Sequence, residues 1–283
     1  MASYWQRTLE DFEKFLSDRP GSGYIDWQPT KWQSLLNVRD ILLENCWPAG
    51  AMERSALELG CGSATLLSQL ASCGVESVGV DRDPAALRLA EAAVKSMGMD
   101  APTLILGDFN DPVTVRNLQA DLVLHVGVIE HFDRAGQLSF LDLSRSLARS
   151  HVLVAVPNER SPVFRSFITA MERADRVYED DHEEISVPEL AAELGLEITI
   201  SDGAHVFLGK REYYNRGDAD LDRFYEEIGE RLRDLNPDRY AAFPDLDFSG
   251  IHVADLRRIE RELDREQRLQ FGFLTYYLLR VPR

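Results

Sequence analysis

The chain has 283 residues, 45% of them hydrophobic, which is enough for one large domain or for a domain with an insertion. Its formal net charge of −17 argues against a nucleic-acid partner, because phosphate backbones are bound through lysine and arginine. No apolar run approaches the roughly 20 residues of a membrane span, and the start of the sequence lacks the apolar stretch of a signal peptide. We therefore expect a cytoplasmic protein without a membrane partner.

Residues 1–50 are predicted to form a helical arm. Apolar residues recur at helical spacing over 1–18, and Pro20, Gly21 and Gly23 break that helix. Thr30 is expected to cap a second helix, which ends at 48–50. All four tryptophans fall within the first 47 residues, so the arm is expected to pack onto the rest of the fold or over its binding site.

From residue 55 onward, short apolar runs alternate with helical patterns. Strands are expected at 55–59, 77–80, 103–106, 121–126 and 151–156, and helices at 64–73, 84–97 and 137–150. The apolar runs lack polar alternation, as expected for parallel strands that are buried on both faces. This order predicts an α/β fold with a doubly wound, mostly parallel seven-stranded sheet and right-handed crossovers.

The pattern loosens after residue 157. We expect a helix at 188–194, a sixth strand at 197–201, helices near 219–235 and 254–268, and a long closing strand at 269–281. The predicted organisation is an N-terminal arm or lid (1–50), a Rossmann-like cofactor-binding core (51–204 plus 269–283) and an inserted substrate lid (205–268).

A glycine turn at the end of the first strand is the main binding signal. Gly60 and Gly62 flank Cys61, and glycine lets a ligand approach the backbone closely. Asp81 ends the next strand, 21 residues after Gly60, where a carboxylate is suited to ribose hydroxyls. A dinucleotide-binding turn would carry a third glycine where this chain has Thr65, so a nicotinamide cofactor is disfavoured.

Four motifs in order resemble those of class I S-adenosylmethionine-dependent methyltransferases of the small-molecule type. They are the run 57–64 (Leu-Glu-Leu-Gly-Cys-Gly-Ser-Ala), the acid Asp81, the run 107–109 (Gly-Asp-Phe), and a fourth strand that begins at Asp121 and is followed by Glu130-His131-Phe132. The resemblance covers roughly residues 55–160. It implies S-adenosyl-L-methionine as cofactor.

The resemblance also implies roles for individual residues. Gly60, Cys61 and Gly62 would lie along the methionine part of the cofactor. Glu58 would lie near the amino group of the cofactor or would only order the turn. Asp81 would hold the ribose hydroxyls. The remaining cofactor contacts would come from Arg82, Asp108, Phe109, His125 and Val126. Asp83 is interpreted as a helix cap, and Asp121 as a residue that orders its strand and the neighbouring loop.

His131 is the candidate for proton chemistry, either as the general base or in a structural role beside the cofactor. The run 179–184 contains His182 among five acids and is interpreted as a solvated loop rather than a metal site. The three cysteines lack metal-ligand spacing and are expected to be reduced thiols. No metal ligand is predicted.

The substrate is expected to meet the arm and the insertion. Candidate contacts are Tyr24, Trp27, Asn158, Tyr213 and Tyr214, although lid packing, or a turn for Asn158, is the favoured explanation of these positions. The sequence predicts methyl transfer to an oxygen or nitrogen of a small molecule. A cofactor-binding protein without transfer (a cyclase or a binding module) and a protein methyltransferase stay open as alternatives, and the motifs leave the accepting atom and the oligomeric state open.

Overall fold

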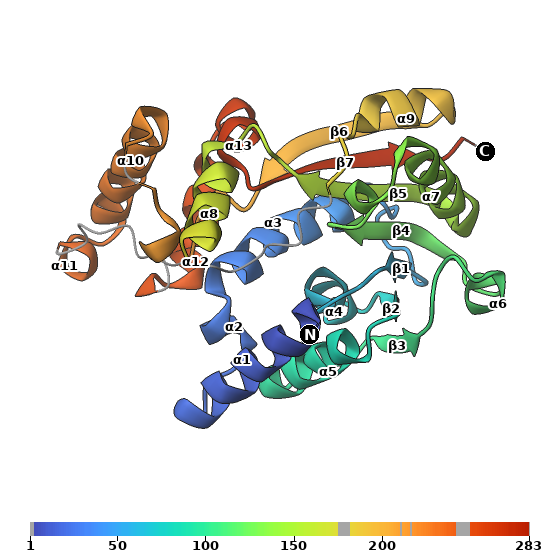
Figure 1. The fold of residues 1–283 in the computed structure, drawn as a ribbon, viewed down its shortest axis with the longest axis horizontal. Helices are drawn as coiled ribbons and strands as arrows, with labels where there is room; N and C mark the ends of the chain where they lie inside the picture. The colour runs from blue at the N-terminus through green and yellow to red at the C-terminus, as the bar shows by residue number, and fades with distance from the viewer. Residues whose placement is uncertain (1–2, 175–181, 210, 216, 242–249, 283) are drawn as a thin grey trace.

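The computed structural model describes residues 3–174, 182–209, 211–215, 217–241 and 250–282. Seven strands form one sheet in the order β3-β2-β1-β4-β5-β7-β6 (Figure 1). The strands are β1 Ser55–Leu59, β2 Glu76–Asp81, β3 Thr103–Leu106, β4 Ala120–Val126, β5 Ala148–Pro157, β6 Glu197–Ala204 and β7 Leu274–Arg280. The predicted doubly wound, mostly parallel sheet is confirmed.

The strand directions place the loops that follow β1, β2 and β4 at one edge of the sheet. β1 pairs in parallel with β2 and β4, β2 with β3, and β4 with β5. Only β7 runs against its neighbours, being antiparallel to both β5 and β6. In open α/β sheets, ligands bind outside the carboxyl ends of the strands where the strand order reverses, here between β1 and β4.

Successive residues of each strand enter separate cores on the two faces of the sheet, because strand side chains alternate. Ala56 and Leu122 pack with α3 and α4 on one face, whereas Leu57 and Val123 pack with α7 and α9 on the other. The flanking helices are α4 Thr65–Ala71, α5 Pro84–Met97, α6 Pro112–Val115, α7 Arg134–Leu147 and α9 Val187–Glu193, with a short 3-10 turn, η1, at Ile129–His131.

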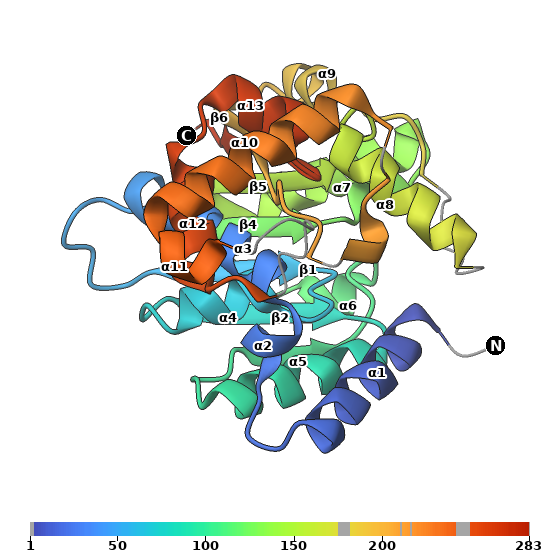
Figure 2. The ribbon, with the colours of Figure 1, turned by 90° about the vertical axis from the view of Figure 1, so that its left-hand side faces the viewer.

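Of the arm helices in residues 3–45, α1 and α2 lie along α5, whereas α3 packs on α4 and α12 (Val253–Glu262) (Figures 1 and 2). The helices are α1 Tyr4–Asp18, α2 Tyr24–Trp27 and α3 Pro29–Asn45. Leu9, Phe12 and Tyr24 of this arm share a core with Leu89 of α5. The predicted Thr30 cap is wrong: Gln28 is the N-cap residue and Pro29 opens the helix, because proline suits a first-turn position that has no partner for its nitrogen.

A second helical unit lies at the other end of the molecule from β3 and α6 (Figure 1). Its helices are α8 Pro162–Arg173, α10 Ala219–Leu235, α11 Pro237–Tyr240, α12 Val253–Glu262 and α13 Arg265–Phe271, with a 3-10 turn, η2, at Arg211–Tyr213. They surround their own core, which includes Phe207, Phe224 and Ile259. The prediction of a strand from residue 269 is wrong over 269–273. A capping box of Asp264 and Gln267 starts α13 at Arg265, and this helix continues to Phe271.

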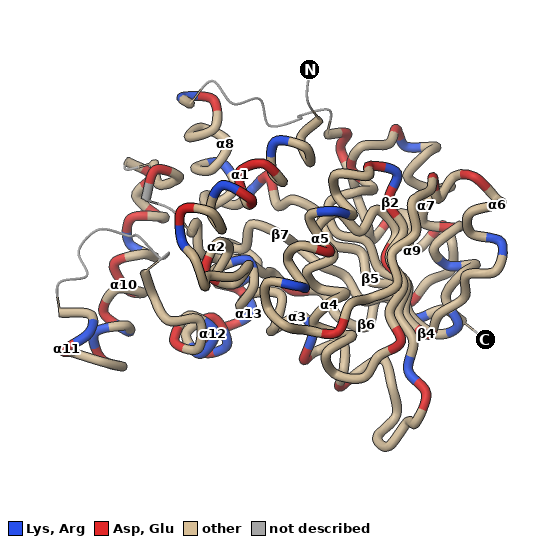
Figure 3. The backbone as a smooth tube through the Cα atoms, turned by 90° about the horizontal axis from the view of Figure 1, so that it is seen from below, with Lys and Arg blue, Asp and Glu red and all other residues tan. Residues whose placement is uncertain are grey.

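The arm and this helical unit are joined through Glu260 of α12. Its carboxylate accepts hydrogen bonds from Ser34 Oγ (2.9 Å) and Asn37 Nδ2 (2.8 Å) of α3 and from the backbone N–H of His205 (2.9 Å). Charged residues of both signs lie along α12 (Figure 3), and Asp40 of α3 pairs there with Arg257.

Two further boundaries differ from expectation. β5 begins at Ala148 rather than His151, since Asp133 caps α7 early and the helix ends at Leu147. The helix α8 was not predicted at all, although Ser161 caps it and Pro162 occupies its first turn. Among the described helices, none combines the length and the apolar character that a membrane crossing requires.

Candidate functional site

The turn after β1 is held against β2 by backbone hydrogen bonds. The N–H groups of Gly60 (2.8 Å) and Cys61 (3.1 Å) both donate to the carbonyl of Val80. Gly60 and Gly62 adopt φ of 70° and 52°, a region that favours glycine. A Cβ on Gly60 would meet Val128 Cγ2 at 2.8 Å, and the Cys61 sulfur packs against Gly79, so the turn offers main chain rather than side chains.

Asp81 orders this turn from the end of β2. One carboxylate oxygen accepts from the backbone N–H of Gly62 (2.8 Å) and the other from that of Asp83 (2.9 Å). Burial raises the pKa of Asp81, and these two hydrogen bonds act in the opposite direction. Asp83 is the N-cap residue of α5, accepting from Ala85 N at 2.8 Å, so the predicted capping role is confirmed.

The arm covers the glycine turn. The Trp5 indole lies so close that a Cβ on Gly62 would meet its ring carbons at 2.5 Å. The Tyr24 hydroxyl contacts Thr65 Oγ1 (3.0 Å) and donates to Ser63 Oγ (3.3 Å) at the start of α4. Lys31 Nζ donates to the same Ser63 hydroxyl at 3.4 Å. A ligand crossing this turn would therefore contact or displace side chains of the arm.

Glu58 is buried beneath the turn, with 4% of its surface exposed. Burial raises the pKa of Glu58 to about 8, although the charge of Lys31 acts in the opposite direction. Burial disfavours the charged form of Lys31, but the nearby Tyr24, Tyr4 and Glu58 outweigh it, so the pKa of Lys31 is raised. Within the described part of the chain, one Glu58 oxygen, Oε2, has no hydrogen-bond partner, which leaves it able to accept from an ammonium group.

The residues predicted to meet the nucleoside follow β2 and β3. A surface hollow between α1 and the start of α5 is lined by Gln6, Arg82 and Arg88, among others. Asp108 is exposed in the loop after β3, and its side chain accepts from Asn110 N at 2.8 Å. The Phe109 ring packs on Phe140 of α7 at 4.8 Å between centroids.

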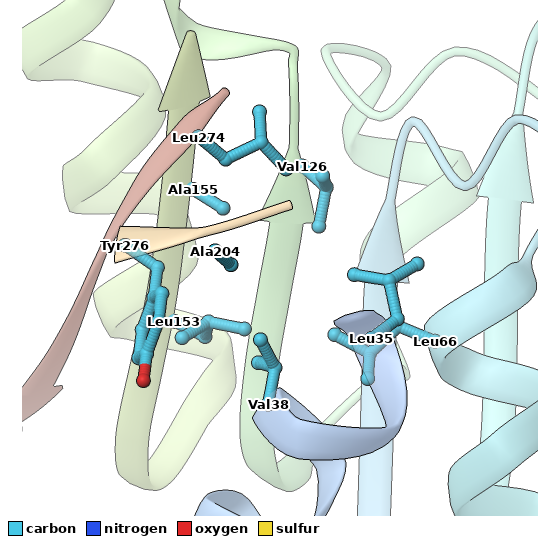
Figure 4. A pocket seen from close by; sticks show the side chains of 9 residues that line it. All are labelled: Leu35, Val38, Leu66, Val126, Leu153, Ala155, Ala204, Leu274 and Tyr276. Carbon is cyan, nitrogen blue, oxygen red and sulfur yellow. The ribbon is translucent and has the colours of Figure 1, made fainter. Parts of the chain in front are cut away.

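His125 and Val126, the two predicted cofactor contacts at the end of β4, differ in where their side chains lie. His125 is fully buried with its ring 4.7 Å from that of Phe140, and burial lowers the pKa of His125 to about 3, so its imidazole is neutral at physiological pH. Any cofactor contact at His125 would be made by its main chain. Val126 instead lines a narrow apolar cavity between the sheet, α3 and α4 (Figure 4). The other side chains at this cavity come from Leu35, Val38, Leu66, Leu153, Ala155, Ala204, Leu274 and Tyr276.

Glu130, His131 and His182 converge beside the carboxyl end of β4. Each offers one ligand atom, and these atoms lie within 4.8 Å of one another. Glu130 is 2% exposed, its Oε2 has no partner among the residues that the structure describes, and burial raises the pKa of Glu130 to about 7. His131 is exposed, and its ring lies 5.1 Å from that of His182. The acidic run that contains His182 is described only for 182–184, since 179–181 lie outside the described residues.

The five predicted substrate contacts do not gather in one place. Tyr24 and Trp27 belong to the arm core, with rings 5.7 Å apart. Tyr213 and Tyr214 pack against the core of the second helical unit, where the Tyr214 hydroxyl donates to Asp222. Asn158 has a structural role: its amide donates to the carbonyls at 269 (2.8 Å) and 272 (3.1 Å), which fixes the connection between α13 and β7.

Sequence reasoning did not identify two side chains of the site. Lys31 follows a proline at a helix start and resembles an ordinary surface lysine in the sequence, so no pattern pairs it with Glu58. His182 follows His131 by 51 residues, and only the fold brings the two imidazoles together. For His182, the available signal was a histidine in an otherwise acidic run.

Comparison with known proteins agrees with this geometry. Residues 56–150 match the family model described as a methyltransferase domain. A search of curated proteins found no match. Among solved structures, magnesium protoporphyrin IX methyltransferase from Synechocystis PCC 6803 with bound SAH matches at a TM-score of 0.50 and 15% identity, over 71% of this chain and 90% of that one.

Two further structures cover more of the chain. A chain from the Haloferax volcanii complex between the Trm112 methyltransferase activator and a methyltransferase matches over 100% of both chains, with a TM-score of 0.50 and 14% identity. A methyltransferase from Thiobacillus denitrificans in complex with S-adenosyl-L-homocysteine matches over 88% of this chain and 91% of that one, with a TM-score of 0.45 and 17% identity. At these identities, the two matches with a TM-score of 0.50 show a shared fold and nothing further.

Proposed function

We propose that this chain, whose residues 56–150 match the methyltransferase-domain model, transfers a methyl group from S-adenosyl-L-methionine to an oxygen or nitrogen of a small molecule. The observation that best supports this proposal is the glycine turn after β1. Asp81 orders its backbone by accepting a hydrogen bond from Gly62 N at 2.8 Å. Bare main chain next to a buried carboxylate suits a ligand with an amino-acid tail and a ribose.

In this proposal the cofactor lies across the carboxyl ends of β1, β2 and β4. Gly60, Cys61 and Gly62 contact the methionine tail, and the unpartnered Glu58 oxygen accepts from its ammonium group. Asp81 accepts from the ribose hydroxyls, while Arg82, Asp108 and Phe109 border the adenine. The main chain of His125 and Val126 borders the tail from the β4 side.

The transfer itself is an in-line displacement. A lone pair on the acceptor attacks the methyl carbon, the carbon–sulfur bond breaks, and its electron pair stays on sulfur as S-adenosylhomocysteine forms. Since the sulfonium is already a good leaving group, the protein contributes mainly alignment and exclusion of water. The acceptor proton passes to a base or to solvent, and His131, exposed at the end of η1, is the candidate for that base.

Isothermal calorimetry with S-adenosylhomocysteine tests the binding half of the proposal. We expect one site in the wild type and at least a tenfold weaker site in Asp81→Ala, because the variant loses both the ribose acceptor and the hydrogen bond to Gly62. Asp121→Ala is the matched control, since Asp121 lies at the opposite ends of β1 and β4. Absence of binding to the wild type would sink the proposal.

Following the label of methyl-tritiated cofactor tests the transfer half. Label that moves into a low-molecular-weight acceptor from a metabolite extract supports the proposed reaction. Label that stays on the cofactor favours a binding protein without transfer, and label that moves into protein favours a protein methyltransferase. His131→Asn then separates a base from a structural residue, because only loss of a base shifts the pH–rate profile.

A further inference from the structure

We propose that Glu130, His131 and His182 form a binding site for a divalent transition-metal ion. The second part of the inference, which rests on the proposed methyl transfer, is that this ion holds an oxygen atom of the acceptor next to the methyl group. The supporting observation is that three ligand atoms of suitable type lie within 4.8 Å of one another, at the edge of the sheet where the cofactor would lie.

The spacing of the three ligand atoms is close to that of a metal site. Ligand atoms about 2.1 Å from one ion lie at most about 4.2 Å apart, and usually nearer to 3.4 Å. The observed span of up to 4.8 Å therefore has to contract by about 0.6 Å for the widest arrangement and by about 1.4 Å for a tetrahedral one. His131 is exposed and can make that adjustment by rotating its side chain.

Glu130 supplies an independent indication of a ligand. Its side chain is buried, with 2% of the residue exposed, and its Oε2 has no hydrogen-bond partner among the described residues. An unsatisfied carboxylate oxygen in such a place is costly, and a cation offsets that cost. The carboxylate of Glu159, 3.7 Å from His182 Nδ1, adds negative charge to the same locality.

The main chain fixes the two segments that carry these residues. Glu130 and His131 lie on η1 directly after β4. The backbone N–H of Glu183, next to His182, donates to the carbonyl of Glu130 at 2.8 Å. Gln137 Nε2 donates to the carbonyls of Phe132 (3.0 Å) and Glu184 (3.3 Å), which ties the ends of both segments to α7. The histidines are thus held together by contacts that do not involve their rings.

The donor set indicates which ions fit. Two imidazoles and one carboxylate favour Zn²⁺, Fe²⁺, Co²⁺ or Ni²⁺ over Ca²⁺ and Mg²⁺, which prefer all-oxygen sites. Glu159 would orient the His182 ring, as carboxylates commonly orient histidine ligands. Three protein ligands leave at least one position for water or for an acceptor oxygen. An acceptor hydroxyl bound there would lose its proton to solvent more readily, because a bound cation lowers the pKa of its ligand. In this arrangement His131 acts as a metal ligand and not as the general base.

Titration with Co²⁺, followed by its visible absorption and by calorimetry, tests the site directly. We expect one ion per chain, with affinity lowered at least about tenfold in His131→Asn and in His182→Asn. His252→Asn is the matched control, since His252 is an exposed helix cap of α12 and should leave Co²⁺ binding unchanged. Glu130→Gln should also weaken binding, and circular dichroism verifies that each variant is folded.

The outcomes separate this inference from the proposed function. S-adenosylhomocysteine binding is measured on the same samples and should persist in the histidine variants. Wild type that binds S-adenosylhomocysteine but not Co²⁺, Zn²⁺ or Mn²⁺ would overturn the metal site and leave the proposed function standing. Co²⁺ binding that survives in a folded His131→Asn/His182→Asn double variant would equally overturn it. Loss of methyl transfer on chelation, restored by Zn²⁺ or Co²⁺, would support the role in holding the acceptor.

Discussion

Two buried glutamates at the same edge of the sheet have opposite surroundings. Glu58, at the end of β1, is 4% exposed and lies near the ammonium group of Lys31. Glu130, after β4, is 2% exposed and lies among two imidazoles, with the carboxylate of Glu159 acting to raise its pKa further. In each, one oxygen, Oε2, finds no hydrogen-bond partner in the portion of the chain that the structure describes.

This difference separates the two halves of the candidate site. On the β1 side the arm brings a cation to the acid, and its tyrosine and lysine also secure the start of α4. On the β4 side the nearest charges increase the negative potential. The β1 half of the site therefore suits a zwitterionic amino-acid tail, and the β4 half suits a cation. Four substitutions test or refine this contrast between the β1 half and the β4 half of the site.

The largest expected effect is the pH dependence of stability caused by Glu58. Its pKa is raised from 4.5 in the unfolded chain to about 8 in the fold, so its contribution to stability is complete below pH 4.5 and is lost as the pH rises to about 8. The loss is at most about 1.4 kcal/mol per pH unit, or roughly 4 kcal/mol between pH 5 and pH 8. In Glu58→Gln that part of the pH dependence should disappear.

Urea unfolding of wild type and Glu58→Gln at several pH values measures this difference. Lys31→Met should steepen the wild-type pH dependence, because it removes the charge that opposes the shift. Parallel curves for wild type and Glu58→Gln from pH 5 to pH 8 would show that Glu58 is ionised in the fold and would remove the basis of the comparison.

The second prediction concerns the contact between the arm and the glycine turn. In Gly62→Ala the new Cβ would meet Trp5 at 2.5 Å, and φ of 52° is strained for alanine. We expect S-adenosylhomocysteine affinity to fall by about 2 kcal/mol, roughly 30-fold, measured by calorimetry. Gly98→Ala is the control: its φ is 62°, but a Cβ there meets nothing within 4 Å.

The control distinguishes strain from crowding. Gly98→Ala should lose about 1 kcal/mol of unfolding free energy without any change in ligand affinity. Adding Trp5→Ala to Gly62→Ala should recover part of the lost affinity if the indole contact causes the loss. Equal affinity in wild type and Gly62→Ala would mean that the ligand does not pass this turn.

The sequence predicted the parts of the site that depend on local pattern. Buried apolar runs gave the strands, glycines gave the turn, and Asp83 before Pro84 gave the start of α5, because each depends on neighbours in the chain. The partners of Lys31 and His182 could not be predicted in this way. Lys31 reaches Ser63 across 32 residues and His182 reaches His131 across 51, and both approaches depend on how distant elements pack.

Two other expectations differ from the structure for different reasons. The aromatic and aliphatic run 269–281 has strand composition throughout, but α13, which starts after the capping box of Asp264 and Gln267, continues to Phe271. Asn158 has the polarity of a substrate contact, yet its amide is used by the carbonyls at 269 and 272. The capping box is a local pattern present in the sequence, whereas the Asn158 contacts span 111 and 114 residues and depend on the fold.

The third prediction places a stabilising acid outside the ligand site. Asp121 Oδ2 accepts from Ser55 N (3.0 Å), Ser55 Oγ (3.1 Å) and Trp47 Nε1 (3.2 Å) at the amino ends of β1 and β4. Asp121→Ala should lower the unfolding free energy by about 2 kcal/mol, because it leaves these donors without an acceptor. Urea unfolding measures the loss, which should be smaller in Asp121→Asn.

Ligand affinity provides the contrast with the glycine turn. Calorimetry should find S-adenosylhomocysteine binding to Asp121→Ala within about twofold of wild type under conditions where the variant is folded. A tenfold loss in affinity would mean that the two ends of β1 are coupled, which would contradict the separation of stability and binding along this strand.

The smallest expected effect is at Ala64, the residue before α4. It has φ of 48° and ψ of 33°, a left-handed conformation that costs a non-glycine residue about 1 kcal/mol. In Ala64→Gly the relief of that strain is offset by the greater chain entropy of glycine and by loss of a buried methyl group. The unfolding free energy should therefore stay within about 0.5 kcal/mol of wild type, whereas Ala92→Gly, inside α5, should lose about 1 kcal/mol. Equal losses in the two variants would show that the turn between β1 and α4 stores no backbone strain, and that its geometry is held by Tyr24, Lys31 and Asp81 alone.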